Sequence, residues 1–295
     1  MAARSFIAGT VLVLGACSPP DAATEADAAA EPDEREPGAP ATPSATASPS
    51  GSTSPLPLQS PTPSPTAGEV PNGPRALSEE TELYLFKQAW PRKVGAIPKL
   101  AARLDREGAA VKRELAEQAE EDRKATEGRG FPFNKHSYSE DWNVVADLPG
   151  WLSLSKDFRT FTGGAHGMYG NASLVWDKRA GVGVKGIELF ASPAVLGEAL
   201  GDRLCEALDA ERLRRRGPEY MPDPDDPFGA CPGVNEATVL VGSSNGRSFN
   251  RIELYFGPYV AGAYAEGAYE LDFPVDAMVL DSVKPEYRSA FSIRR

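Results

Sequence analysis

Alternating apolar and polar residues mark a series of short segments between residues 81 and 273. A period of two is typical of β-strands, whose successive side chains point to opposite faces of a sheet. The first segment, Thr81–Trp90, ends at Pro91, which cannot continue a ladder of hydrogen bonds. Turn-forming glycines and prolines separate the others. We therefore predict further strands over residues 142–148, 151–161, 172–177, 238–242, 250–256 and 269–273.

Two longer segments have the helical period instead. Between Lys99 and Thr126, apolar side chains share one face and charged side chains fill the others. A second helix is predicted from Ser192 to Arg216, with a proline in its first turn and a stripe of leucines along one face: Leu196, Leu200, Leu204 and Leu208. A short helix follows Pro274. Helices that do not alternate strictly with the strands predict an α+β fold, a mainly antiparallel sheet packed with two main helices.

The N-terminal residues have the pattern of a signal peptide. Arg4 precedes the uncharged, largely apolar run Phe6–Ala16, which is too short to span a bilayer as a helix. No other segment reaches 18 consecutive apolar residues. The run ends in Leu14-Gly15-Ala16-Cys17, which resembles the lipobox of bacterial lipoproteins. That resemblance implies cleavage after residue 16 and lipid attachment at Cys17. The alternative is an ordinary secretory peptide that contains a cysteine.

A linker is predicted to follow. Residues 18–74 contain 14 of the 27 prolines and no aromatic residue, so they cannot bury enough apolar surface to offset the entropy of ordering. We assign 1–16 to the signal peptide, 17–75 to the lipidated cysteine and a disordered linker, and 76–295 to one compact domain. Within that domain, 76–135 forms a strand–helix part and 136–285 contains the glycine-rich motif described below.

Charge and cysteine content narrow the classes of function. The whole chain carries −11, of which the linker accounts for −7 and Arg4 for +1, which leaves −5 for the domain. A mildly acidic domain without a basic cluster argues against nucleic-acid binding. With Cys17 used for lipid, Cys205 and Cys231 remain, and an even pair in an exported domain favours a disulfide. Two free buried thiols are the alternative.

Two loops carry the candidate binding residues. In the first, Gly163 and Gly164 allow positive φ and precede His166. The second, residues 257–267, is rich in glycine and carries Tyr259 and Tyr264, side chains that suit contact with proteins or glycans. The alternatives are a tight hairpin with a structural histidine in the first loop and half-buried core aromatics in the second.

The histidines, the cysteines and a G-x-S-x-G segment are the candidates for metal or nucleophile chemistry. The two histidines, 30 residues apart, and the two remaining cysteines lack the spacing of metal ligands, so neither a metal nor another cofactor is predicted. Gly242–Gly246 fits G-x-S-x-G, but it lies between two predicted strands and both histidines precede it. A nucleophile elbow joins a strand to a helix, so we interpret this motif as a hairpin turn.

Together the two loops carry a resemblance to a known family. The stretch FRTFTGGAHGMYGNASLVWD, with GGAH at Gly163–His166, and the later PYVAGAYAEG at Pro258–Gly267 are similar to the extracytoplasmic domain shared by the anti-sigma factor RsiV and the deacetylase PdaC. The resemblance extends over about residues 78–285. It implies an α+β domain of the cell envelope with no established catalysis of its own.

The expected function follows from the anchor and this resemblance. We expect a membrane-anchored envelope lipoprotein with a non-catalytic domain that binds peptidoglycan or a secreted, lysozyme-like protein. Ser18 after the lipidated cysteine resembles an outer-membrane sorting context, with the domain facing the periplasm. Only sixteen residues precede the anchor, so direct anti-sigma signalling is not expected. The alternatives are a cell-wall-modifying enzyme that uses His166 with an acidic partner, and a purely structural envelope protein.

Overall fold

The computed structural model describes residues 73–221, 223 and 225–294. The predicted signal peptide, Cys17 and the linker up to residue 72 lie outside the described residues. Among the helices of the described part, none combines the length and apolar character that crossing a bilayer requires.

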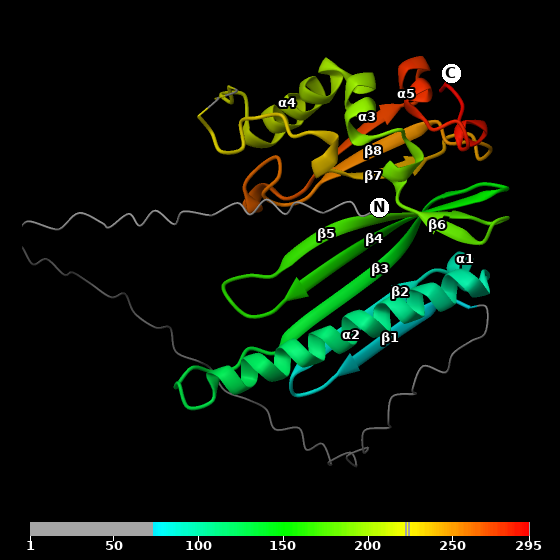
Figure 1. Cartoon of the computed structure of the whole chain (residues 1–295). Coiled ribbons are helices and arrows are strands. Elements are labelled where there is room, and N and C mark those ends of the chain that lie inside the picture. Colours follow the sequence, from blue (N-terminus) through cyan, green and yellow to red (C-terminus); the bar gives the residue numbers. More distant parts are fainter. Residues whose placement is uncertain (1–72, 222, 224, 295) are drawn as a thin grey trace, which may run out of the picture. The chain divides into compact units, whose positions relative to one another are not determined.

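A six-stranded sheet forms the first layer (Figure 1). Its strands lie side by side in chain order: β1 (Arg75–Glu80), β2 (Tyr84–Trp90), β3 (His136–Asp147), β4 (Trp151–Phe161), β5 (Met168–Asp177) and β6 (Val182–Val184). All neighbours are antiparallel except β2 and β3, which pair in parallel because a helical crossover connects them.

The crossover consists of α1 (Arg92–Gly95) and α2 (Pro98–Thr126). The apolar face of α2 packs on the sheet, where Leu100 and Leu104 are fully buried in a cluster with tryptophans of β2, β3 and β5. A Cβ at Gly108 would lie 2.0 Å from Nε2 of Gln88. Gln88 is itself buried and donates from Nε2 to the Leu104 carbonyl at 3.0 Å. Glycine at 108 therefore permits the close approach of helix and sheet.

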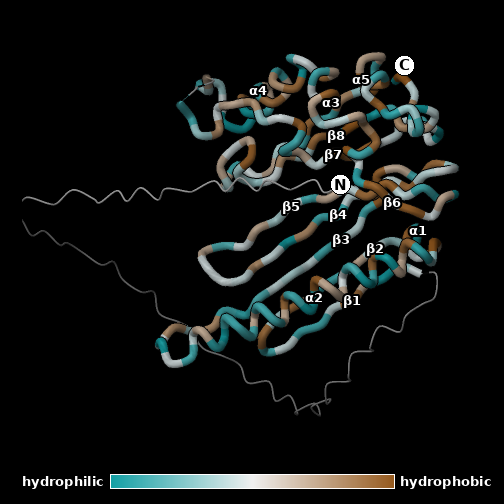
Figure 2. The backbone as a smooth tube through the Cα atoms, viewed as in Figure 1, coloured by the Kyte–Doolittle hydropathy of each residue, from teal (hydrophilic) through white to brown (hydrophobic). Residues whose placement is uncertain are grey.

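The second layer is a three-stranded antiparallel sheet with helices on one face. Its strands are β7 (Thr238–Gly242), β8 (Arg251–Phe256) and β9 (Tyr269–Pro274), and its helices are α3 (Pro193–Leu200), α4 (Asp202–Arg216) and α5 (Ala277–Ser282). Short 3-10 turns occupy Gly186–Leu189, Val234–Glu236, Tyr264–Glu266 and Arg288–Ala290. The largest buried cluster lies between this sheet and its helices, and Figure 2 shows the hydrophobic character of β7 and β8.

The two sheets meet where β7 lies against β3, β4 and β5. Thr238 donates through Oγ1 to the Asn171 carbonyl at 2.8 Å, and Ser173 Oγ accepts from the Gly186 amide at 2.9 Å. Val175 of β5 belongs to the same buried cluster as the β7–β9 core. The sheets therefore share apolar core at this junction, and the Thr238–Asn171 hydrogen bond joins them directly.

The predicted α+β class, the mainly antiparallel pairing and the helix over residues 99–126 are confirmed. The predicted single strand Thr81–Trp90 begins at Tyr84, because Thr81 Oγ1 accepts hydrogen bonds from the amides of Leu83 and Tyr84 and so makes a turn. The preceding strand β1 was not predicted. Strands β3 and β5 begin earlier than expected, at His136 and Met168.

The prediction of one helix from Ser192 to Arg216 is wrong. Gly201, with φ 56° and ψ −144°, separates α3 from α4. The leucine stripe is nevertheless buried on both sides of the break. The predicted disulfide is confirmed: Cys205 of α4 is bonded to Cys231, with a Cα–Cα distance of 5.5 Å.

Candidate ligand-binding site

Aromatic residues from the two predicted loops gather in one cluster. The rings of His166 and Tyr264 stack with centroids 4.1 Å apart, and the Tyr259 ring lies 5.5 Å from that of Tyr264. Tyr169, at the start of β5, meets Tyr264 edge-on at 5.9 Å. We call His166, Tyr169, Tyr259 and Tyr264 the aromatic cluster. It joins the β4–β5 loop to the β8–β9 loop, which are about a hundred residues apart in the chain.

Glycines shape the first loop. Gly163 and Gly164 adopt φ values of 95° and 87°, and a Cβ at either position would meet nothing within 4 Å. These glycines are therefore required by backbone conformation and not by crowding. The turn leaves His166 exposed, with Nδ1 3.0 Å from the Gly167 carbonyl and Nε2 3.2 Å from the Tyr259 hydroxyl.

Tyr259 has an unusual backbone. Its φ of 68° makes it the one non-glycine residue with positive φ among the described residues. A side chain in this region costs on the order of 1–3 kcal/mol, and residues held so cluster at functional sites. Tyr259 is also 47% exposed. The fold therefore holds an exposed aromatic ring in place at an energetic cost.

Ion pairs from α4 fix the second loop. Arg216 reaches the Glu266 carboxylate with Nε at 2.9 Å and Nη2 at 3.1 Å, and it also bonds Asp226. The Tyr269 hydroxyl donates to Glu266 at 2.5 Å. Burial alone would raise the pKa of Glu266, but the hydrogen bonds from Arg216 and Tyr269 lower it to about 2. The carboxylate therefore stays charged at neutral pH and anchors the loop.

Arg212 supports the same loop from within the core. It is 0% exposed, and its guanidinium donates to the Ala261 carbonyl from Nε at 3.1 Å and from Nη2 at 3.0 Å. Further donations reach the carbonyls of Phe228, Gly229 and Ala230, next to the disulfide. A buried guanidinium with all these acceptors is satisfied. It ties α4 both to the β8–β9 loop and to the segment that precedes Cys231.

The structure brings His166, Tyr259 and Tyr264 together and places Gly163 and Gly164 in the turn that presents His166. Whether these residues bind a ligand stays a prediction. Tyr169 was missed, although its position at the start of β5, next to the glycine-rich loop, was a usable signal. The supporting arginines lie near the C-terminal end of the helix predicted over Ser192–Arg216, and nothing in the sequence pattern marks Arg212 as buried.

The catalytic alternatives find no matching constellation in the described part of the chain. There, both ring nitrogens of His166 lie against a carbonyl and a phenol, and no carboxylate is among its hydrogen-bond partners. The segment Gly242–Gly246 is the β7–β8 turn, in which Ser244 Oγ contacts the Asn250 amide. Within residues 73–294, no group of three or more His, Cys, Asp or Glu side chains could hold a metal.

Comparison with known proteins agrees with the predicted family for part of the chain. Residues 77–169 match the family model described as Deacetylase PdaC. The match confirms the PdaC-type resemblance over this segment, which contains the GGAH motif and ends before the second motif. No curated protein matches the chain.

Solved structures of the DUF3298 family are also similar to this chain. A member from Bacteroides fragilis is 15% identical, with a TM-score of 0.45 over 74% of this chain and 95% of its own. A DUF3298 family protein from Pseudomonas aeruginosa is 19% identical, with a TM-score of 0.44 over 75% of this chain and 97% of its own.

Proposed function

We propose that this chain is a lipid-anchored protein of the cell envelope whose domain binds an extracytoplasmic ligand without turning it over. The observation that carries the proposal is the aromatic cluster, assembled from two distant loops and held by buried arginine contacts. Rigid loops that present exposed rings are typical of binding surfaces. The lipobox resemblance at Cys17 and the sorting context at Ser18 support attachment to the outer membrane, facing the periplasm.

The first candidate ligand is a peptidoglycan saccharide. Tyrosine and histidine rings combine an apolar face with a polar tip, and a sugar ring presents C–H faces beside hydroxyl groups. Tyr259, which is 47% exposed, would supply the stacking face. The Tyr259 hydroxyl and His166 Nε2, 3.2 Å apart, would exchange hydrogen bonds with the ligand.

A second candidate is a basic, lysozyme-like secreted protein. The domain carries a net charge of about −5, as derived from the whole-chain composition. Opposite net charges steer two proteins together and raise their association rate. A protein ligand would make binding strongly sensitive to salt, whereas a neutral saccharide would not.

Calorimetry on the chain from residue 18 onward tests both candidates. We expect binding of muropeptides or of lysozyme, and loss of about tenfold in affinity or more when Tyr259 and Tyr264 are both replaced by alanine. Phe131→Ala is the matched control, because Phe131 is an exposed aromatic residue outside the aromatic cluster. Absence of binding to both ligands would remove the proposal, and unchanged affinity in the double variant would move the site elsewhere.

Mass spectrometry of muropeptides after incubation tests the absence of turnover. We expect their masses to stay unchanged. Loss of acetyl groups or new reducing ends, abolished by His166→Ala, would favour the enzymatic alternative instead.

A further inference from the structure

The Cys205–Cys231 disulfide lies beside the side chains that support the aromatic cluster. Cys205 is in the first turn of α4, and the chain before Cys231 runs back along this helix. Asp226 pairs with Arg216 at the end of α4, and five residues later Cys231 is bonded near its start. We call residues 225–231 the disulfide segment.

Arg212 contacts the disulfide segment and the β8–β9 loop at the same time. On one side its guanidinium donates to the carbonyls of residues 228–230. On the other side it donates to the Ala261 carbonyl from Nε and from Nη2. Ala261 lies in the chain between Tyr259 and Tyr264, so this contact reaches the loop that carries two members of the aromatic cluster.

Arg216, one turn further along α4, makes the same kind of bridge. It donates to the Asp226 carboxylate from Nη1 at 2.9 Å and to the Glu266 carboxylate from Nε at 2.9 Å. Glu266 in turn accepts from the Ala263 amide at 3.1 Å, within the β8–β9 loop. The disulfide segment and the β8–β9 loop therefore share two guanidinium groups.

This sharing couples the order of the two parts. Arg212 is 0% exposed, and a buried charge that loses its partners is strongly destabilised. Without the disulfide segment, Arg212 would lose three carbonyl acceptors and keep Asp209 and Ala261. We therefore expect the guanidinium to turn toward water and to leave the Ala261 carbonyl.

The disulfide is placed where a thiol can reach it. Cys231 is exposed, and the amides of Phe228 and Gly229 bond to Asp226 inside the disulfide segment itself. In the described part of the chain, the hydrogen bonds that join this segment to α4 are those of Arg212 and Arg216. Exposed disulfides are more easily reduced than buried ones and are the ones that serve regulation.

We infer that the Cys205–Cys231 disulfide is a redox switch: its reduction by a dithiol loosens the β8–β9 loop and lowers the affinity of the aromatic cluster for its ligand. A thiolate of the dithiol attacks Cys231 Sγ, the S–S bond breaks, and Cys205 leaves as a thiolate. The second thiol of the dithiol then displaces Cys231. Two electrons pass to the cysteines, which take up two protons, and the dithiol leaves as a disulfide. The effect on affinity rests on the proposed function, whereas the effect on the loop does not.

Amide hydrogen exchange of the full chain, purified in detergent, tests the effect on the loop without a ligand. The reporters are the Ala263 amide, bonded to Glu266, and the Gly267 amide, bonded to the Tyr264 carbonyl. We expect both to exchange at least about fivefold faster after reduction with dithiothreitol, while amides of β3 and β4 stay unchanged. Equal exchange of the reporters in the two states would overturn the inference.

A variant that keeps the disulfide decides the matter if reduction unfolds the domain, which fast exchange in β3 and β4 would reveal. Asp226→Asn removes the ion pair with Arg216, and we expect it to speed exchange of Ala263 and Gly267 by about threefold. Unchanged exchange in Asp226→Asn would contradict the shared support.

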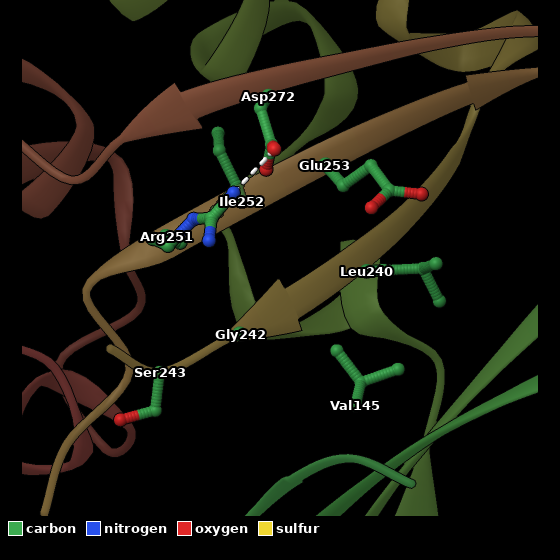
Figure 3. A pocket seen from close by; sticks show the side chains of 8 residues that line it. All are labelled: Val145, Leu240, Gly242, Ser243, Arg251, Ile252, Glu253 and Asp272. Atoms are coloured by element: carbon green, nitrogen blue, oxygen red, sulfur yellow. Dashed lines mark hydrogen bonds and ion pairs between the residues drawn. The ribbon is translucent and has the colours of Figure 1, made fainter. Parts of the chain in front are cut away.

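Asp272→Asn is the matched control. It also removes an aspartate paired with an arginine, Arg251, and Figure 3 shows this pair. Asp272 is exposed on β9, where it alternates with Leu271 and Phe273, which belong to the core shared with α4. It therefore lies on the sheet face away from that helix, and exchange of the reporters should equal that of the parent.

Calorimetry with muropeptides and with lysozyme separates the switch from the proposed function. The double variant Cys205→Ser, Cys231→Ser replaces the reduced chain, so that no reductant contacts the ligand. We expect it to bind at least about fivefold more weakly than the parent, as when the loop holds its binding conformation a fifth of the time. Equal affinities would overturn the inference. Binding by neither chain, with the reporters still faster after reduction, would refute the proposed function and support the redox coupling of the loop.

Discussion

At the scale of single residues, a substitution at Tyr259 is expected to change stability and ligand affinity in opposite directions. Its positive φ is strained for tyrosine but not for glycine. We predict that Tyr259→Gly raises the free energy of unfolding by about 0.5–1 kcal/mol, measured by urea denaturation. The same change removes the exposed ring. Ligand affinity should therefore fall, as it should in the variant in which Tyr259 and Tyr264 are both replaced by alanine.

Tyr259→Ala is the control for this prediction, because it removes the ring and keeps the strain. If Tyr259→Gly and Tyr259→Ala are equally stable, the backbone at 259 stores no strain in solution.

Glu253 makes stability depend on pH in an unusual direction. Burial and neighbouring carboxylates raise the pKa of Glu253 to about 7 in the folded chain, above its unfolded value of 4.5. Between these values the folded chain keeps a proton that the unfolded chain has lost, so stability falls as pH rises. We predict that the free energy of unfolding of the parent falls by about 1–2 kcal/mol between about pH 5 and about pH 8 because of Glu253. In Glu253→Gln this part of the pH dependence should be absent.

Urea denaturation of the parent and Glu253→Gln at both pH values checks this. Glu82→Gln, which changes an exposed glutamate on the β1–β2 turn, should keep the pH dependence of the parent. A Glu253→Gln curve parallel to the parent curve would contradict the raised pKa.

Some residue roles follow from residue type and position, and others do not. The positive φ of Gly163 and Gly164 was identifiable, because glycine adopts it at no steric cost. The loop tyrosines were identifiable as candidates for an exposed surface, and Tyr259 is exposed in the structure. Arg212 was not identifiable, because its burial depends on carbonyls of residues 228–230 and 261 that fold onto it from elsewhere in the chain. Long-range hydrogen bonds of this kind leave no local pattern.

At the scale of elements, the contact between α4 and the β8–β9 loop rests on Glu266. Hydrogen bonds from Arg216 and Tyr269 hold the pKa of Glu266 at about 2, against 4.5 when unfolded. The resulting stability is present above about pH 4.5 and is lost as pH falls toward 2. We predict that Glu266→Gln costs about 2 kcal/mol at neutral pH and almost nothing near pH 2, measured by urea denaturation.

Asp281→Asn is the control for Glu266→Gln, since it removes the partner of an exposed ion pair with Arg288. Exposed pairs contribute little, so this variant should differ from the parent by less than about 1 kcal/mol at either pH. A Glu266→Gln cost that persists unchanged near pH 2 would argue against the ion pair as its source.

Element prediction succeeded where periodicity was strong. The helix over residues 98–126 and most strands were recognised from their repeating apolar positions. The break at Gly201 was not, because the leucine stripe continues in register through it and masks the change of direction. Strand β1, with the sequence RALSEE, carries one large apolar residue and is held by pairing with β2 rather than by burial.

At the scale of the whole molecule, the sequence pattern did not predict that the strands form two separate sheets. Alternation identifies strands but not their neighbours, so the parallel β2–β3 pair and the separation of β7–β9 into a second sheet depend on tertiary contacts. For the same reason the contact between His166 and Tyr259 could not be predicted, because it follows from the packing of one sheet on the other.

The disulfide closes a segment of 26 residues between α4 and the loop that Arg212 holds. A cross-link of this length stabilises by about 3–4 kcal/mol in the chain-entropy model. We predict that the double variant Cys205→Ser, Cys231→Ser loses this amount in urea denaturation, and that dithiothreitol destabilises the parent but not the variant. Equal stability of the reduced and oxidised parent would contradict this role.

The proposed anchor governs where all of these sites operate. Cys17 lies outside the described residues, so its lipidation rests on the lipobox resemblance. We predict that cells fed a labelled fatty acid incorporate it into the parent chain and not into Cys17→Ser, and that the parent partitions into the detergent phase of a cloud-point extraction. Several acyl chains together give stable membrane attachment, whereas a single chain is marginal. Cys205→Ser, which keeps Cys17, is the control and should remain labelled. Label that persists in Cys17→Ser would refute the anchor, whereas the Cys205–Cys231 disulfide of the folded domain would stand.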